Sequence, residues 1–197
     1  MNTRSRRLLA FLALSLSATA SQALTYTAHL TGPGESPSNT SPGIGDGTVN
    51  LDLTAHTLSI DMTFSGLLSG TTASHIHCCI APPGATAVAT QVPTFTGFPL
   101  GVTSGSYSNT FDTLSAATWN PTFITASGGT AAAAEAALSA GLAAGNSYLN
   151  IHTSQFPSGE IRGFLTASTG GQVPEPAALA LFGIGAAGLL AGRRKRS

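Results

Sequence analysis

The chain of 197 residues is long enough for one domain with targeting segments, and only 8% of its residues are charged. The formal net charge is zero, but seven of the eight basic residues lie within the first seven or the last five positions. Within residues 24–167, Arg162 is the only base among seven acidic residues, so this part carries a net charge of −6 with neutral histidines. Nucleic-acid binding requires clustered lysine and arginine, and the acidic interior therefore excludes a nucleic-acid partner.

The N-terminus has the three parts of a secretion signal. A basic segment, Arg4–Arg7, precedes the apolar run Leu8–Ala20 and the small-residue site Ser21-Gln22-Ala23. We expect signal peptidase to remove residues 1–23 and the mature protein to begin near Leu24.

The first half of the interior reads as short strands separated by loops. Residues 24–30 predict a strand, and the proline- and glycine-rich stretch 31–47 predicts a loop. Apolar residues then alternate with polar ones over 49–54 and 58–64, which predicts two antiparallel strands around a turn at Ala55-His56.

The second half adds further strands and one helix. Residues 72–80 and 106–114 predict strands on either side of a long excursion over 85–104. Thr130–Ala144 is rich in alanine, with Thr130 as a candidate N-cap and Gly145 as a stop, and it predicts a helix that crosses over to the last strands.

A closing hairpin is predicted over Tyr148–Leu165. Residues 148–152 and 160–165 alternate as strands, and Phe156-Pro157-Ser158-Gly159 has the composition of a turn. The chain is therefore expected to be mainly β, as an antiparallel β-sandwich or flattened barrel over residues 24–167, with one crossover helix and a targeting helix at each terminus.

The hairpin resembles the end of the CHRD domain, a module repeated in chordin and found singly in many bacterial proteins. The runs Y-L-N-I-H-T and G-E-I-R-G of the hairpin and S-H-I-H at Ser74–His77 occur in the order of that family, and the resemblance covers roughly residues 24–165. The family is defined by resemblance more than by a shared activity, so the likeness implies a fold and not a function.

The C-terminus resembles the PEP-CTERM sorting signal. After a linker at 168–172, the motif Val173-Pro174-Glu175-Pro176 precedes an apolar run, Ala177–Gly192, and a basic end that begins with Arg193 and Arg194. The apolar run would be about 24 Å long as a helix, slightly short for a bilayer core. The resemblance implies that the helix enters the membrane only transiently and is removed by an exosortase in a Gram-negative, exopolysaccharide-making bacterium. The alternative is a permanent C-terminal anchor.

Two histidines on one predicted strand suggest a metal site. His75 and His77 alternate with Ile76, so both rings lie outside the core if Ile76 faces it. On the later strand, His152 points to the face opposite Leu149. If the two strands are neighbours, the three imidazoles converge. Neutral imidazole is a good ligand for copper and zinc. The alternative is that these rings only pack or form hydrogen bonds.

The H-x-H strand also resembles the copper-binding strand of copper/zinc superoxide dismutase. The additional loop histidines and the aspartate of that family have no counterpart here, so the resemblance leaves a simpler copper or zinc site.

Cys78 and Cys79 are adjacent in a chain predicted to reach an oxidising compartment, where free thiols seldom persist. Three states remain open: a vicinal disulfide, a bond to another chain, or metal ligation. We favour the vicinal disulfide.

Glu160 and Arg162 share a phase on the last predicted strand, which predicts a structural salt bridge between them. Motifs for a nucleophile elbow, a zinc protease or a phosphate-binding loop do not occur. The leading hypothesis is a non-enzymatic, exported β-domain with no required cofactor. At the cell surface or in the extracellular matrix it is expected to bind polysaccharide or other matrix components, or to have a structural role. The alternative is a copper- or zinc-binding protein.

Overall fold

The computed structural model describes residues 23–168, and the predicted signal peptide, sorting motif and targeting helices lie outside this range. The described residues are mainly antiparallel β-structure. The strands are β1 (Leu24–Thr31), β2 (Ile44–Asp52), β3 (Thr57–Ser65), β4 (Thr71–Cys78), β5 (Gly105–Asp112), β6 (Ser147–Thr153), β7 (Ile161–Phe164) and β8 (Thr166–Ala167).

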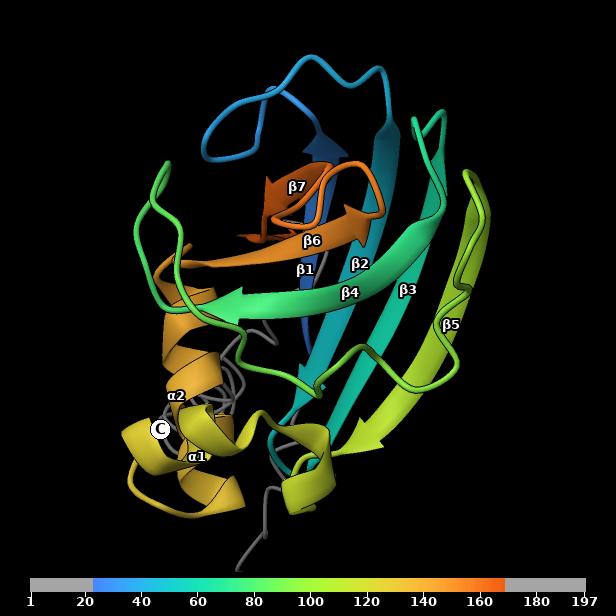
Figure 1. Ribbon diagram of the computed structural model, residues 1–197. Helices are drawn as coiled ribbons and strands as arrows, with labels where there is room; N and C mark the ends of the chain where they lie inside the picture. The colour runs from blue at the N-terminus through green and yellow to red at the C-terminus, as the bar shows by residue number, and fades with distance from the viewer. Residues whose placement is uncertain (1–22, 169–197) are drawn as a thin grey trace, which may run out of the picture. The chain divides into compact units, whose positions relative to one another are not determined.

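All of these strands belong to one sheet, in the order β4-β6-β7-β1-β2-β3-β5, with β8 paired to β1. The sheet curls so that β6 crosses in front of β2, and β4 crosses in front of β2 and β3 (Figure 1). Contacts confirm this crossing, since Ser74 of β4 lies 3.8 Å from the sulfur of Met62 on β3. The architecture is a curled half-barrel, in agreement with the fold class expected from the sequence.

The hydrophobic core fills the inside of the curl. Its members come from the apolar phases of the alternating strands, with aromatic residues from the segment between β4 and β5. The fully buried residues include Leu30, Leu51, Leu58, Ile60, Ile76, Phe95, Leu149 and Ile151.

Strand β2 begins at Ile44, inside the stretch 31–47 that was predicted to be a loop. That prediction was wrong for its last four residues because two glycines there are needed for packing. A Cβ on Gly47 would lie within 2.4 Å of the Leu149 side chain, and one on Gly45 within 3.3 Å of Ile161. The glycines leave the space in which β6 and β7 pack over β2.

The predicted helix is α2 (Ala131–Ala143), with Thr130 as its N-cap and Gly145 at a φ of +68° just beyond its end. Glu135 fixes the helix to the sheet, since its carboxylate accepts hydrogen bonds from Thr113 and from His56 in the β2–β3 turn. A short helix, α1 (Pro121–Ala126), was not predicted; Asn120 caps it. Within residues 23–168, neither helix has the length and hydropathy to cross a bilayer.

Candidate metal centre

His75 and His77 of β4 and His152 of β6 come together on one face of the sheet. The two strands are direct neighbours, with Ala73 opposite His152 and Ile76 opposite Leu149. One nitrogen of each ring lies within 4.8 Å of the others. The ring centroids of His75 and His152 are 5.2 Å apart, and those of His77 and His152 are 6.0 Å apart.

Each imidazole has one nitrogen bonded to a backbone carbonyl. His75 Nε2 lies 2.7 Å from the oxygen of Pro93, His77 Nδ1 lies 2.7 Å from that of Thr86, and His152 Nδ1 lies 2.9 Å from that of Pro157. A carbonyl oxygen can only accept, so the bonded nitrogen carries the proton in each ring. The three carbonyls therefore fix both the tautomer and the orientation of the rings.

The other nitrogen of each ring is left as a lone-pair donor. His75 Nδ1, His77 Nε2 and His152 Nε2 are all buried and have no hydrogen-bond partner. Buried polar atoms without a partner are uncommon in native proteins, and three in one cluster require an explanation. A metal-binding histidine usually donates its second N–H to a carbonyl or carboxylate, which is the pattern of all three rings.

Burial keeps the cluster neutral. It lowers the pKa of His75 to about 4 and that of His77 to about 4, and it also lowers the pKa of His152. The carbonyl hydrogen bonds raise these pKa values by less than burial lowers them. The rings are therefore unprotonated at neutral pH, which is the form that binds metals.

The histidines face away from the core, as their phase predicted, but they are not on an open surface. His75 is 6% exposed and His77 is 8% exposed. The segment between β4 and β5 covers them, running along the free edge of β4, where Ala89 N–H donates to the carbonyl of Ile76. The sequence gives no sign of this cover, because the segment has no regular secondary structure.

Tyr148 and Arg162 support the cluster from the side. The Tyr148 ring stacks on His77 at 4.7 Å between centroids and 8° between planes, and the Arg162 guanidinium lies 4.7 Å from the centroid of the Tyr148 ring. The Tyr148 hydroxyl bonds to the backbone of Thr86, whose carbonyl also holds His77. These contacts hold the ring of His77 in place.

The three histidines offer three neutral imidazole nitrogens in one buried cluster. Zinc sites with three histidines and one open position are well established, and imidazole also suits copper. Zn–N distances of about 2.1 Å require the three nitrogens to approach one another through small ring rotations. A single copper or zinc ion fits this donor set.

The family comparison agrees with the sequence motifs around these residues. The CHRD domain model matches residues 26–165. The chain belongs to the CHRD domain family. No curated protein and no solved structure matches the chain.

Residues 172–196 match the PEP-CTERM protein-sorting motif. This motif implies processing by an exosortase during export and sorting to the cell surface in Gram-negative bacteria. The CHRD domain is therefore the exported part of a surface-sorted protein.

Arg162 of the CHRD domain does not pair with Glu160, so the predicted salt bridge is wrong. Its guanidinium donates to the carbonyls of Gly34, Pro83 and Gly84, and Nε lies 3.8 Å from the carboxylate of Glu35. The sequence places Glu35 in a proline-rich loop 127 positions away, and only the fold brings the two together. Burial raises the pKa of Glu35 to about 7, although Arg162 and Asn150 lower it.

Glu160 has a different structural role. Its buried carboxylate accepts hydrogen bonds from the hydroxyls of Ser41 and Thr153 and from the backbone N–H of Leu68. It therefore ties three segments together at one end of the CHRD domain. Both oxygens of the Glu160 carboxylate therefore accept hydrogen bonds from uncharged donors, and neither bonds to Arg162.

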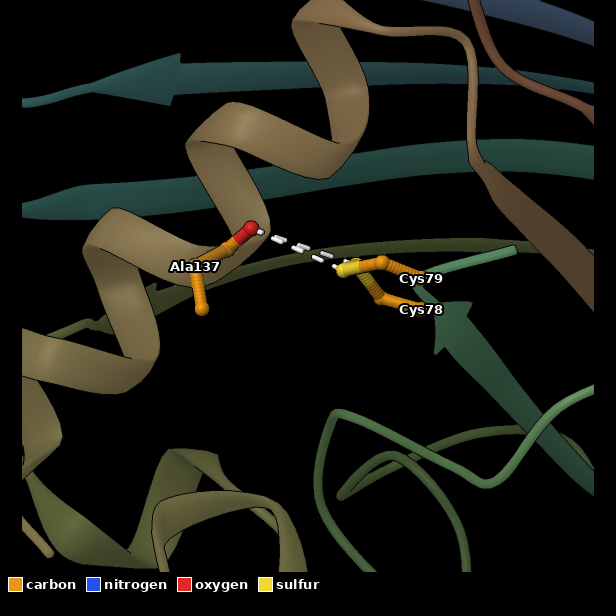
Figure 2. The surroundings of a disulfide bond; sticks show 3 residues. All are labelled: Cys78, Cys79 and Ala137. Atoms are coloured by element: carbon orange, nitrogen blue, oxygen red, sulfur yellow. Dashed lines mark hydrogen bonds between the residues drawn. A yellow bond between two sulfur atoms is a disulfide. The ribbon is translucent and has the colours of Figure 1, made fainter. Parts of the chain in front are cut away.

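Cys78 and Cys79 are bonded to each other, and residues 23–168 contain no free cysteine. Figure 2 shows the pair against α2, where the two sulfur atoms lie 4.0 and 3.6 Å from the carbonyl oxygen of Ala137. A disulfide has no S–H to donate, so these are close contacts and not hydrogen bonds. Neither cysteine belongs to the histidine cluster, so the structure contradicts the alternative in which they ligate the metal.

Sequence reasoning missed three residues of this region: Tyr148, Asn150 and Glu35. The first two share the phase of His152 on β6, so the alternation that selected His152 also points to them. For Glu35 the sequence offers no signal, because a lone acid in a loop is usually solvated.

Proposed function

We propose that the CHRD domain of this surface-sorted protein is a metal-binding module that holds one copper or zinc ion at His75, His77 and His152. The observation that carries the proposal is the trio of buried nitrogens without partners, each on a ring whose other nitrogen is held by a carbonyl. Hydrogen-bonded packing alone would leave no reason for three acceptors to be buried together.

The histidine cluster is preorganised, which supports tight binding. Each ring is already neutral and already oriented, so binding requires neither deprotonation of the imidazoles nor a large loss of side-chain freedom.

Metal content tests the proposal. The protein, purified without chelator and then equilibrated with zinc or copper, should hold one ion per chain, as measured by elemental analysis. A variant with His75→Gln and His77→Gln should lose it. His29→Gln removes an exposed histidine outside the cluster and should retain full metal content. A wild-type protein without stoichiometric metal, or a double variant that keeps it, contradicts the proposal.

We also propose that the exported domain acts among the components of the extracellular matrix. The sorting motif favours this setting, and the domain has a shallow groove of about 420 Å³ on the outer face of β2, β3 and β5. Met62 and Tyr107 supply apolar surface to this groove, which suits the faces of sugar rings. The other lining residues carry hydroxyl or carboxylate groups that can bond to sugar hydroxyls: Asp46, Thr48, Asp61, Thr63, Ser106 and Ser108.

Sedimentation of the purified protein with exopolysaccharide from the producing cells tests this second proposal. Binding should weaken when Thr48 and Thr63 are replaced by valine, which keeps the β-propensity of both positions. Equal binding by this variant, or none by the wild type, contradicts it.

A further inference from the structure

Five buried side-chain nitrogen or oxygen atoms of residues 23–168 have no hydrogen-bond partner. Three are the free nitrogens of the histidine cluster. The fourth is Oδ1 of Asn150, and the fifth is the hydroxyl of Ser147 at the start of β6, close to the disulfide. A buried acceptor without a donor costs roughly 1–3 kcal/mol, so Asn150 requires an explanation of its own.

Asn150 lies beside the cluster. It is directly opposite His75 in the β4–β6 pair, and it lies between Tyr148 and His152 on the same face of β6. Opposite residues of antiparallel strands have Cβ atoms about 4.5–5.5 Å apart. Four of the five orphaned atoms therefore belong to neighbouring positions on one face of two strands.

The orientation of the Asn150 amide is defined by its other end. Nδ2 donates to the Glu35 carboxylate at 2.5 Å and lies 3.4 Å from the carbonyl of Ile161. Both partners are acceptors, so the nitrogen is held there and Oδ1 is the end left free. Gly159 makes room for this pair, since a Cβ there would lie 2.6 Å from both Asn150 Nδ2 and Glu35 Oε1.

We propose that Asn150 belongs to the metal centre and that its Oδ1 supplies the oxygen contact at the fourth position of the ion, directly or through one bound water. Three-histidine zinc sites characteristically have a fourth position filled by oxygen. Glu35, itself held beside Arg162, is the positioning residue that keeps Oδ1 turned to the centre. The inference rests on the proposed three-histidine site.

Zinc affinity and the visible spectrum of bound Co²⁺ test the inference in the whole protein. Asn150→Leu keeps the size of the side chain and removes the oxygen, and it should weaken zinc binding about 10- to 100-fold. A direct contact predicts an altered Co²⁺ spectrum as well, whereas a contact through water predicts weaker binding with a spectrum close to wild type. The matched control is Asn50→Leu, an asparagine on β2 bonded to Thr25, which should bind zinc as the wild type does.

A second variant exchanges the two partners, as Glu35→Gln with Asn150→Asp. The net charge and the hydrogen bond between the two positions are kept, while a carboxylate oxygen replaces Oδ1 at the centre. Zinc should bind at least tenfold more tightly, and this variant decides the matter if Asn150→Leu does not fold. Unchanged zinc affinity in either variant overturns the inference and leaves the three-histidine proposal standing. A wild-type protein that binds no metal overturns both.

Discussion

At the scale of single residues, backbone carbonyls decide what the histidines can do. The carbonyls of Pro93, Thr86 and Pro157 each accept the N–H of one ring, so the second nitrogen of each ring keeps a free lone pair. Two of these carbonyls belong to the irregular segment between β4 and β5. The chemistry of the strand residues is therefore set by a segment that has no strand or helix of its own.

Because the histidine rings are buried and neutral, the free energy of unfolding of the metal-free protein should depend on pH. The pKa of His75 and of His77 is about 4 in the folded state and near 6.5 in an unfolded chain. As the pH falls from 6.5 to 4, the unfolded chain takes up protons that the buried rings do not, so the free energy of unfolding falls. The contribution of the two neutral rings to the free energy of unfolding is fully present above pH 6.5. Once the pH has fallen to 4, about 3 kcal/mol of it is lost for each ring.

Denaturant unfolding with chelator present, measured at several pH values, checks this prediction. In the variant with His75→Gln and His77→Gln, the free energy of unfolding should change less between pH 6.5 and 4. Glu35 also titrates near this range, but it is present in both proteins and therefore does not account for the difference between them. Parallel profiles for the two proteins would contradict the pKa assignment.

Replacing Arg162 should reduce stability strongly, because its side chain is buried and donates hydrogen bonds to three carbonyls from two loops. Arg162→Met should cost about 3–5 kcal/mol of unfolding free energy, since it leaves the Glu35 carboxylate buried without its cation. Adding Glu35→Gln to this variant should recover part of the loss. A cost below about 1 kcal/mol for Arg162→Met would show that the buried pair contributes little.

The part of the site that depends on the alternation of side chains along the strands could be predicted from the sequence. Alternation placed His75, His77 and His152 on one face, and the hairpin pattern placed β6 correctly. The salt bridge failed because the partner of Arg162 is Glu35, in a loop whose position depends on the whole fold. The burial of the histidines was missed for the same reason, since it depends on how an irregular segment lies on β4.

At the scale of elements, glycines set the closest approaches. Gly141 of α2 faces the disulfide, and a Cβ there would lie 2.3 Å from the sulfur of Cys78 and 2.7 Å from that of Cys79. Glycine in the interior of a helix ordinarily destabilises the helix. The structure gives the reason that glycine is needed there.

Gly141→Ala should therefore destabilise the protein, by about 1–3 kcal/mol, although alanine has the higher helix propensity. Denaturant unfolding measures the change. The control is Ala140→Gly at an exposed position of the same helix, which should cost only about 1 kcal/mol through propensity. Stabilisation by Gly141→Ala would show that the helix moves away from the disulfide at no cost.

The strands themselves were predictable because each has one apolar phase. Val49, Leu51, Leu58 and Ile60 all lie in the core, as their alternation requires. The start of β2 was not predictable, because Gly45 and Gly47 read as loop residues until the crossing of β6 is known. The choice between sandwich and barrel was also open in the sequence, since both have the same alternating pattern and differ only in how the sheet closes.

At the scale of the whole molecule, the match to the sorting motif predicts a processed C-terminus. Mass spectrometry of the protein from the cell surface should find a chain that ends near the Val173–Pro176 motif and lacks the basic residues Arg193 and Arg194. Replacing Pro174 and Glu175 by alanine should leave the C-terminal segment attached. A surface protein that retains Arg193 and Arg194 would contradict exosortase processing.

In the proposed site, one ion is held by three imidazoles and by no sulfur. X-ray absorption spectroscopy at the zinc or copper edge of the loaded protein measures these ligands. We expect the multiple-scattering pattern of three imidazoles, a fourth light-atom ligand, and no metal–sulfur distance near 2.3 Å. A sulfur ligand, or a spectrum with one imidazole or none, would show that the proposed site is wrong.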